Sequence, residues 1–234
     1  MPAGLFGKLP AKRDFVAANA PRRFLEAWEP WLQASLATAK QTLGADWADV
    51  YNRAPLWRFW LGADICGQAV IGAWTPSVDG VGRAFPMAIF AGESDMTLPP
   101  PELESNDAWF EAVEQLLLDA LDPAADFEAF ARSVASLPEP QRQSRERELS
   151  GLEELAEGGV LARDIGAQAA LAFRAARRFD HRNAFAAQTF WWTIGGEDFP
   201  SLALALTGMP RATRFVDLLT GEFAPAVGEG GHER

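Results

Sequence analysis

The stretch that decides the fold is WRFWLGADICGQAVIGAWTPSVDGVGRAFPMAIFA, residues 57–91. It holds three apolar, strand-like runs, at 57–61, 69–74 and 85–91, and turn residues separate them. Three successive strands with short connections are typical of an antiparallel meander. We therefore predict an α/β (α+β) fold, in which helices flank a largely antiparallel central sheet.

The residues before this stretch predict one more strand and a long helix. Residues 5–9 form an apolar run that ends at Pro10, and Pro21 suits the first turn of a helix. Apolar residues then recur at helical spacing as far as Leu43. Pro30 lies inside this pattern, so we expect it to kink or split the helix.

Residues that follow the meander predict a helical region. Ser105 is a suitable N-cap for a helix that extends to Leu121, and residues 127–137 predict a second helix. The two helices resemble a hairpin laid on the sheet. Residues 138–159 are poor in large apolar side chains, and we expect a mobile connection with some helical character.

The C-terminal third mixes helical and strand patterns. We expect a helix at 167–178, a strand at 189–194, and closing helices at 199–206 and 214–219. The coarse topology resembles a longin- or profilin-like sandwich. We predict a single domain over residues 1–224, in which residues 93–180 are mainly a helical elaboration, and a disordered tail at 225–234.

Composition and cysteine content indicate the compartment. The chain of 234 residues is 48% hydrophobic and 23% charged, which is usual for globular proteins. Cys66 has no partner for a disulfide, which favours a reducing compartment. No basic segment followed by an apolar one begins the chain, and no uncharged stretch is long enough to span a bilayer. We expect a cytoplasmic protein without membrane insertion.

The net charge of −11 is concentrated in one segment. Residues 84–131 contain eleven acids and no Lys or Arg, while the rest of the chain is balanced. Such a charge disfavours nucleic-acid binding, which needs a basic surface. The acidic segment is either a solvated helical face, which we favour, or a surface for a basic protein partner.

Enzyme motifs are incomplete in this chain. Gly4–Lys8 lacks the spacing of a phosphate-binding loop, and Phe85 stands where a dinucleotide fingerprint needs its third glycine. The two histidines and Cys66 have no metal-ligand spacing. We expect no catalytic residue, no metal and no cofactor.

Two short cassettes place charges unusually close to glycine and proline. The first cassette is Gly4–Pro10 followed by Asp14–Val16, and the second is Pro76–Arg83 followed by Phe85-Pro86. Two explanations remain open. Asp79 accepts N–H groups within its own turn while Asp14 pairs with Arg83 or Lys8, or the charged residues form a cluster that grips a partner. The partner-binding candidates in the cassettes are Lys8, Arg13, Asp14, Ser77, Asp79 and Arg83.

Trp191 and Trp192 complete the set of partner-binding candidates. They are adjacent in a predicted strand, so their side chains point to opposite faces of the sheet. One belongs to the core, and the other is exposed unless a helix covers it. An exposed tryptophan is a frequent contact residue.

The cassettes resemble the N-terminal signature of the TagF family, also called ImpM, of type VI secretion system-associated proteins. Gly4–Pro10, Asp14–Val16 and Pro76–Arg83 carry most of the similarity. Weaker similarities continue through Trp191-Trp192 and Gly208–Pro210. Ala11-Lys12-Arg13 depart from the Ser-Arg-Gly that the family usually has before its Asp-Phe pair.

The resemblance implies regulation without catalysis. Family members are cytoplasmic proteins of the bacterial type VI secretion system that repress secretion after translation, and the forkhead-associated scaffold protein is implicated as a partner. Two alternatives stay open. One is a small hydrolase that uses Asp79 or Asp14 with Lys8 and Arg83. The other is a scaffold that binds a nucleotide-loaded switch GTPase.

Overall fold

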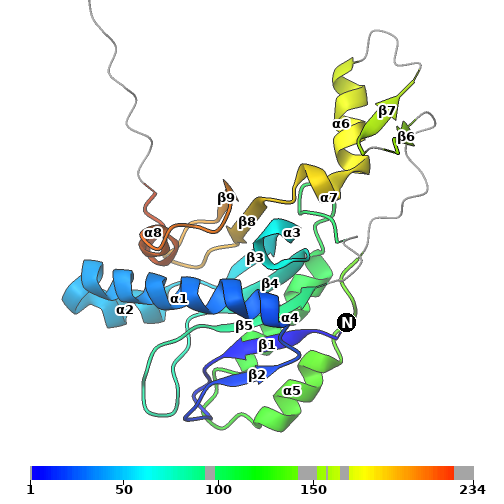
Figure 1. Cartoon of the computed structure of the whole chain (residues 1–234). Helices are drawn as coiled ribbons and strands as arrows, with labels where there is room; N and C mark the ends of the chain where they lie inside the picture. Colours follow the sequence, from blue (N-terminus) through cyan, green and yellow to red (C-terminus); the bar gives the residue numbers. More distant parts are fainter. Residues whose placement is uncertain (1, 93–97, 142–151, 157, 164–168, 224–234) are drawn as a thin grey trace, which may run out of the picture.

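A seven-stranded sheet forms the centre of the protein (Figure 1). The computed structural model describes residues 2–92, 98–141, 152–156, 158–163 and 169–223. All neighbouring strands are antiparallel, in the order β2-β1-β5-β4-β3-β8-β9. The strands are β1 (Gly4–Gly7), β2 (Val16–Ala18), β3 (Trp57–Leu61), β4 (Val70–Thr75), β5 (Met87–Gly92), β8 (Gln188–Thr193) and β9 (Leu202–Thr207). The predicted meander is confirmed as β3-β4-β5.

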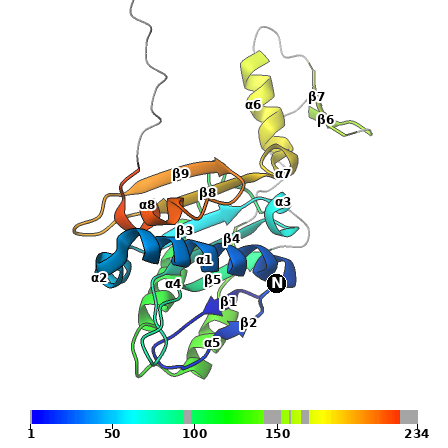
Figure 2. The same ribbon diagram turned by 60° about the vertical axis from the view of Figure 1, so that its left-hand side comes forward.

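Helices cover both faces of this sheet (Figures 1 and 2). One face packs against α1 (Arg22–Leu43), α2 (Trp47–Arg53), α3 (Ala63–Cys66) and α8 (Arg214–Thr220). The opposite face packs against α4 (Asp107–Asp119) and α5 (Phe127–Ala135). Because both faces are covered, strands such as β3 are buried at every position and do not alternate between apolar and polar residues. The predicted mixed α+β class is confirmed.

A small arm projects from this body. It consists of α6 (Ala169–Phe179), α7 (His181–Ala184) and a separate pair of strands, β6 (Leu152–Glu154) and β7 (Val160–Ala162) (Figure 1). The predicted helix at 167–178 is therefore present as α6. Helical character predicted for 138–159 is not found among the described residues 152–156, which form a strand and a turn, and residues 142–151 lie outside the described chain.

Aromatic residues dominate the face beneath α1. Trp28, Trp57, Trp74 and Trp191 are fully buried there. The indole Nε1 of Trp57 donates to the Leu218 carbonyl at 2.9 Å, so the polar atom of that ring is satisfied. Buried apolar area contributes about 25 cal/mol per Å², and large rings supply much of it. This face therefore contributes a large share of the stability of the fold.

Two expectations about helices are wrong. Residues 199–206 do not form a closing helix, because Leu202–Thr207 are strand β9 and pair with β8 from end to end. Leu and Ala favour helices, yet their strict alternation here has the period of a strand, and burial alternates with it. The split expected at Pro30 does not occur, because α1 continues for 22 residues and carries this proline on its exposed side, while a kink at Pro30 stays a prediction.

The sheet takes strands from both ends of the chain, since β1 lies near the N-terminus and β9 near the C-terminus. The single domain over residues 1–224 stays a prediction. Residues 93–180 contain α4, α5, β6, β7 and α6, and the remaining helix of the arm, α7, begins at residue 181. The predicted tail at 225–234 lies outside the described residues.

Candidate functional site

The two cassettes meet around the carboxylate of Asp79. Lys8 follows β1, and its Nζ lies 3.0 Å from Oδ2 of Asp79 in the β4–β5 connection. Arg83 Nε donates to the same oxygen at 2.7 Å. The Asp79 side chain is 0% exposed and that of Lys8 is 9% exposed. We call these three residues the Asp79 clasp.

The second oxygen of Asp79 is used by the backbone. Oδ1 accepts the N–H groups of Val81 at 3.1 Å and Arg83 at 2.9 Å. Burial by itself raises the pKa of this carboxyl, but the hydrogen bonds from Arg83, Lys8 and Val81 outweigh it and hold the pKa well below its usual range. Asp79 is therefore a stably ionised group with both oxygens occupied.

Further hydrogen bonds join the loops on either side of the clasp. Ser77 Oγ donates to the Lys8 carbonyl at 2.7 Å, and Arg83 Nη2 donates to the Arg13 carbonyl at 2.6 Å. The N–H of Gly80 donates to the Lys12 carbonyl at 2.7 Å. These bonds connect residues about 70 positions apart in the chain, so the clasp holds the two cassettes in one arrangement.

Backbone geometry explains two of the cassette glycines. Gly82 has φ +84°, a left-handed conformation that side chains other than glycine rarely adopt. At Gly7 an added Cβ would lie 2.2 Å from the Pro86 carbonyl oxygen. Glycine at position 82 allows the turn after Asp79, and glycine at position 7 lets the two cassettes approach closely.

The two cassettes that the clasp joins also carry exposed side chains, and Arg83 belongs to both groups. Phe15 is 46% exposed and Val81 is 58% exposed, while the Arg83 side chain is 60% exposed. Phe15 contacts Phe85 edge to face, with ring centroids 4.7 Å apart, and Lys8 Nζ lies 5.0 Å from the centre of the Phe15 ring. We call Phe15, Val81 and Arg83 the rim.

The structure brings together most of the cassette residues predicted from sequence. Lys8, Ser77, Asp79 and Arg83 are adjacent, and Arg13 takes part through its carbonyl. Acceptance of N–H groups by Asp79 within its turn is confirmed. The predicted pairing of Asp14 with Arg83 or Lys8 is wrong, because both cations pair with Asp79 and Asp14 is exposed.

The two tryptophans of β8 lie on opposite faces, as alternation predicts. Trp191 is fully buried between Trp28 and Trp31, with ring centroids 6.0 and 5.1 Å away. The prediction that Trp191 contacts a partner is therefore wrong, because its side chain is fully buried and a partner cannot reach it. Trp192 is half-buried, and α4 covers it through an edge-to-face contact with Phe110 at 4.9 Å.

A second buried charge was missed by the sequence analysis. Arg58, in β3, is 6% exposed, and its Nε donates to Glu114 Oε1 of α4 at 2.6 Å. Its Nη1 lies 3.5 Å from Asp107 Oδ1, and its guanidinium carbon lies 5.0 Å from the centre of the Phe110 ring. We call Arg58, Glu114 and Asp107 the Arg58 clamp. An arginine inside a strand that is otherwise apolar was the available signal.

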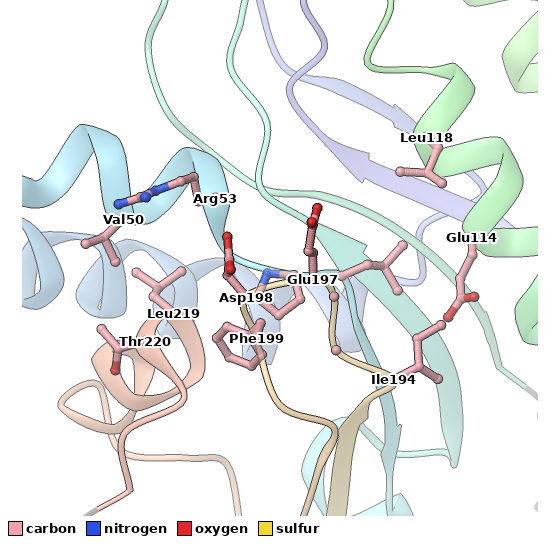
Figure 3. A pocket seen from close by; sticks show the side chains of 14 residues that line it. Val50, Arg53, Glu114, Leu118, Ile194, Glu197, Asp198, Phe199, Leu219 and Thr220 are labelled. Atoms are coloured by element: carbon pink, nitrogen blue, oxygen red, sulfur yellow. The ribbon is translucent and has the colours of Figure 1, made fainter.

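An open cleft is lined by none of the cassette residues, although Glu114 of the Arg58 clamp is part of its wall (Figure 3). Its volume is about 670 Å³, and α2, α4, α8 and the β8–β9 connection contribute its walls. Leu118 and Ile194 are on one side, 55% and 69% exposed. Glu197 and Asp198 bring negative charge to it. The cleft combines exposed apolar side chains with acids and with Arg53.

The described residues show neither a cluster suited to a metal ion nor a helix suited to crossing a membrane. In that part of the chain, His, Cys, Asp and Glu do not gather in groups of three or more that could hold a metal ion. None of its helices combines the length and the apolar character that crossing a membrane requires. Cys66 is buried, and burial raises the pKa of its thiol to about 11, so it is a poor nucleophile.

Comparison with known proteins gives a consistent result. None of the curated proteins compared with the chain matches it. The crystal structure of PA0076 from Pseudomonas aeruginosa PAO1 is similar, with a TM-score of 0.78, 32% identity, and coverage of 98% of this chain and 99% of that one. Residues 4–137 match the TagF N-terminal domain, described as type VI secretion system-associated. The chain therefore belongs to the TagF family of type VI secretion system-associated proteins.

Proposed function

We propose that this protein is a non-enzymatic cytoplasmic regulator that represses type VI secretion after translation by binding a component of the apparatus. The candidate partner is the forkhead-associated scaffold protein. The observation that carries the proposal is the Asp79 clasp, whose charges are used to hold two loops together. The rim of Phe15, Val81 and Arg83 is thereby presented in a fixed arrangement, which lowers the entropic cost of binding.

A small hydrolase is the alternative that the clasp most directly concerns. Lys8 and Arg83 do each lie within hydrogen-bond distance of Asp79, as such an enzyme would need. However, a general base must have a free oxygen and a pKa near the working pH. Asp79 has neither, since four groups donate to it and its pKa is lowered. The clasp thus favours binding over catalysis.

A scaffold for a nucleotide-loaded switch GTPase is the second alternative. Its support is the likeness of the sheet and helices to longin- or profilin-like sandwiches, and a fold alone does not indicate a function. The rim offers a more specific argument. Its members are an exposed aromatic ring, an exposed aliphatic side chain and an exposed guanidinium, and aromatic residues and arginine are enriched at protein–protein contacts.

Direct binding to the scaffold protein tests the proposal. We expect the wild-type protein to bind the immobilised forkhead-associated scaffold of its own secretion system. Val81→Asp should weaken this binding about tenfold without a change in melting temperature, because Val81 is exposed at the tip of its loop. Arg83→Ala should weaken binding similarly and lower the melting temperature by only a few degrees, because its side chain is largely exposed.

The control is Ala37→Asp, which places the same charge on the exposed side of α1, away from the cassettes. It should bind like the wild type. Equal binding by all four proteins would remove the rim as the contact surface. Failure of the wild type to bind the scaffold or any other purified component of the apparatus, together with unchanged effector secretion in a deletion strain, would refute the proposed function.

A further inference from the structure

The two edges of the sheet differ in how they are protected. β2 forms one edge with only three residues, and Lys12, Arg13 and Asp14 precede it. Short strands and nearby charges are devices that prevent an edge from pairing with another chain. β9 forms the opposite edge with six residues, Leu-Ala-Leu-Ala-Leu-Thr, and contains no charge and no proline (Figure 2).

The outer side of β9 is open among the described residues. Within that part of the chain β9 pairs with β8 alone, which leaves the N–H and C=O groups of its other side without a strand partner. Its leucines are half-buried, and Leu202 and Leu204 pack against the core beneath α1 and α8. Ala203, Ala205 and Thr207 are exposed on the opposite face of the strand. Such an edge is a template for one more strand.

Charge indicates which strand fits this edge. The chain has a net charge of −11, so two copies repel one another over much of their surface. Residues 186–196 and 199–210, which contain β8 and β9, hold no ionisable side chain. Glu197 and Asp198 in the β8–β9 connection are the acids between these ranges. Along β9 itself, a second copy therefore meets little repulsion.

The sequence of β9 is also complementary to itself. When the strand pairs with its own copy in antiparallel fashion about a two-fold axis normal to the sheet, residues directly opposite point to the same face. Centring this pair on Leu204 places Leu202 opposite Leu206 and Ala203 opposite Ala205. Every leucine then lies on one face of the joined sheet, continuous with the core, and each alanine lies on the other.

We propose that β9 is the interface of a homodimer, in which the β9 strands of two copies pair antiparallel and join the two sheets into one. The interface is a single pair of short strands, at the small end of the range for specific complexes. We therefore expect a dissociation constant on the order of 10 µM. The proposal concerns a surface other than the rim and does not depend on the proposed function.

Sedimentation equilibrium of the full chain at several concentrations tests the proposal. We expect the average mass to rise from that of the 25.5 kDa monomer toward twice that value as the concentration passes through about 10 µM. A double variant, Ala203→Lys with Ala205→Lys, places two lysines opposite two lysines of the partner. Both positions are exposed, so the variant should keep the wild-type melting temperature and weaken dimerisation at least about tenfold.

A second double variant at the same two positions replaces one of the lysines by glutamate and should restore dimerisation. Ala203→Lys with Ala205→Glu places each lysine opposite a glutamate across the two-fold axis, so dimerisation should return to at least the wild-type level. Ala17→Lys, at the exposed centre of β2, is the control for the other edge and should dimerise like the wild type.

Three results would overturn the proposal. One is a wild type that stays monomeric up to about 1 mM, far above the expected dissociation constant. Another is a double-lysine variant that dimerises as well as the wild type, which would place the interface elsewhere. The third is a lysine–glutamate variant as monomeric as the double-lysine variant although its melting temperature is unchanged. A monomeric wild type whose β9 instead captures an extended segment of another protein would assign the edge to that protein.

Discussion

The Asp79 clasp and the Arg58 clamp each compensate one buried charge with two charges of opposite sign, and the buried charge is negative in the clasp and positive in the clamp. In the clasp, one buried carboxylate lies between two cations, and in the clamp, one buried guanidinium lies between two carboxylates. Asp79 also accepts two backbone N–H groups, whereas Arg58 is completed by the ring of Phe110. The clasp therefore depends on loop conformation, and the clamp depends on how α4 lies on the sheet.

The two groups should also differ in what happens when the central charge is removed. Removing the central ion of the clasp leaves a buried ammonium at Lys8 and releases two loops from one another. Removal of the central ion of the clamp leaves Glu114, whose side chain is 16% exposed, and Asp107, which is 65% exposed and reaches water easily. We expect the clasp to be the more sensitive of the two, because its unpaired partner is the more deeply buried.

Asp79→Ala should have the largest effect. The Lys8 ammonium, with 9% of its side chain exposed, loses the carboxylate that compensates for its burial. We expect the melting temperature, measured by circular dichroism, to fall by about 10 °C. Asp14→Ala is the matched control, since this aspartate is exposed, and it should melt like the wild type. Equal melting of the two variants would mean that the clasp does not stabilise the fold.

Arg58→Ala should have an intermediate effect. It removes the ion pair with Glu114 and the contact with Phe110, and we expect a loss of about 3 kcal/mol in the free energy of unfolding in urea. Combining it with Glu114→Gln should cost less than the sum of the two single changes, because the second change removes the carboxylate that the first leaves unpaired. Strictly additive losses would show that the 2.6 Å contact contributes nothing to stability.

Dependence on pH should give the smallest of the three effects. The pKa of Asp79 is lowered in the folded protein, so its contribution to stability is complete above the ordinary pKa of about 3.9 and declines as the pH falls below it. Between pH values of about 4 and 2, the melting temperature of the wild type should therefore fall more steeply than that of Asp79→Asn. Parallel slopes for wild type and Asp79→Asn would contradict the lowered pKa.

Sequence patterns predicted the clasp better than the clamp, and the reason is physical. Charges among glycines and prolines mark loops that need a particular shape, so Lys8, Asp79 and Arg83 stood out. Which carboxylate would bind the two cations was predicted wrongly in part, because Asp14 and Asp79 are equally plausible until the loops are placed together. Arg58 stands out only as an arginine in an otherwise apolar strand. Nothing near it in the sequence identifies its partner, because Glu114 is 56 residues away on another element.

The sequence by itself determined those elements whose side chains repeat with a clear local period. The meander of β3, β4 and β5, the long α1 and the hairpin of α4 and α5 follow from such patterns, because each needs only its own apolar face to be recognised. Tertiary structure supplied the pairing with β8 that makes Leu202–Thr207 a strand. The helix prediction there followed the propensity of Leu and Ala and overlooked their alternation, which has the period of a strand. Tertiary structure also decided which tryptophan of β8 is covered by which helices and which buried charges meet. Pairing and burial are relations between distant segments, and their free energies are set by neighbours that a local pattern does not contain.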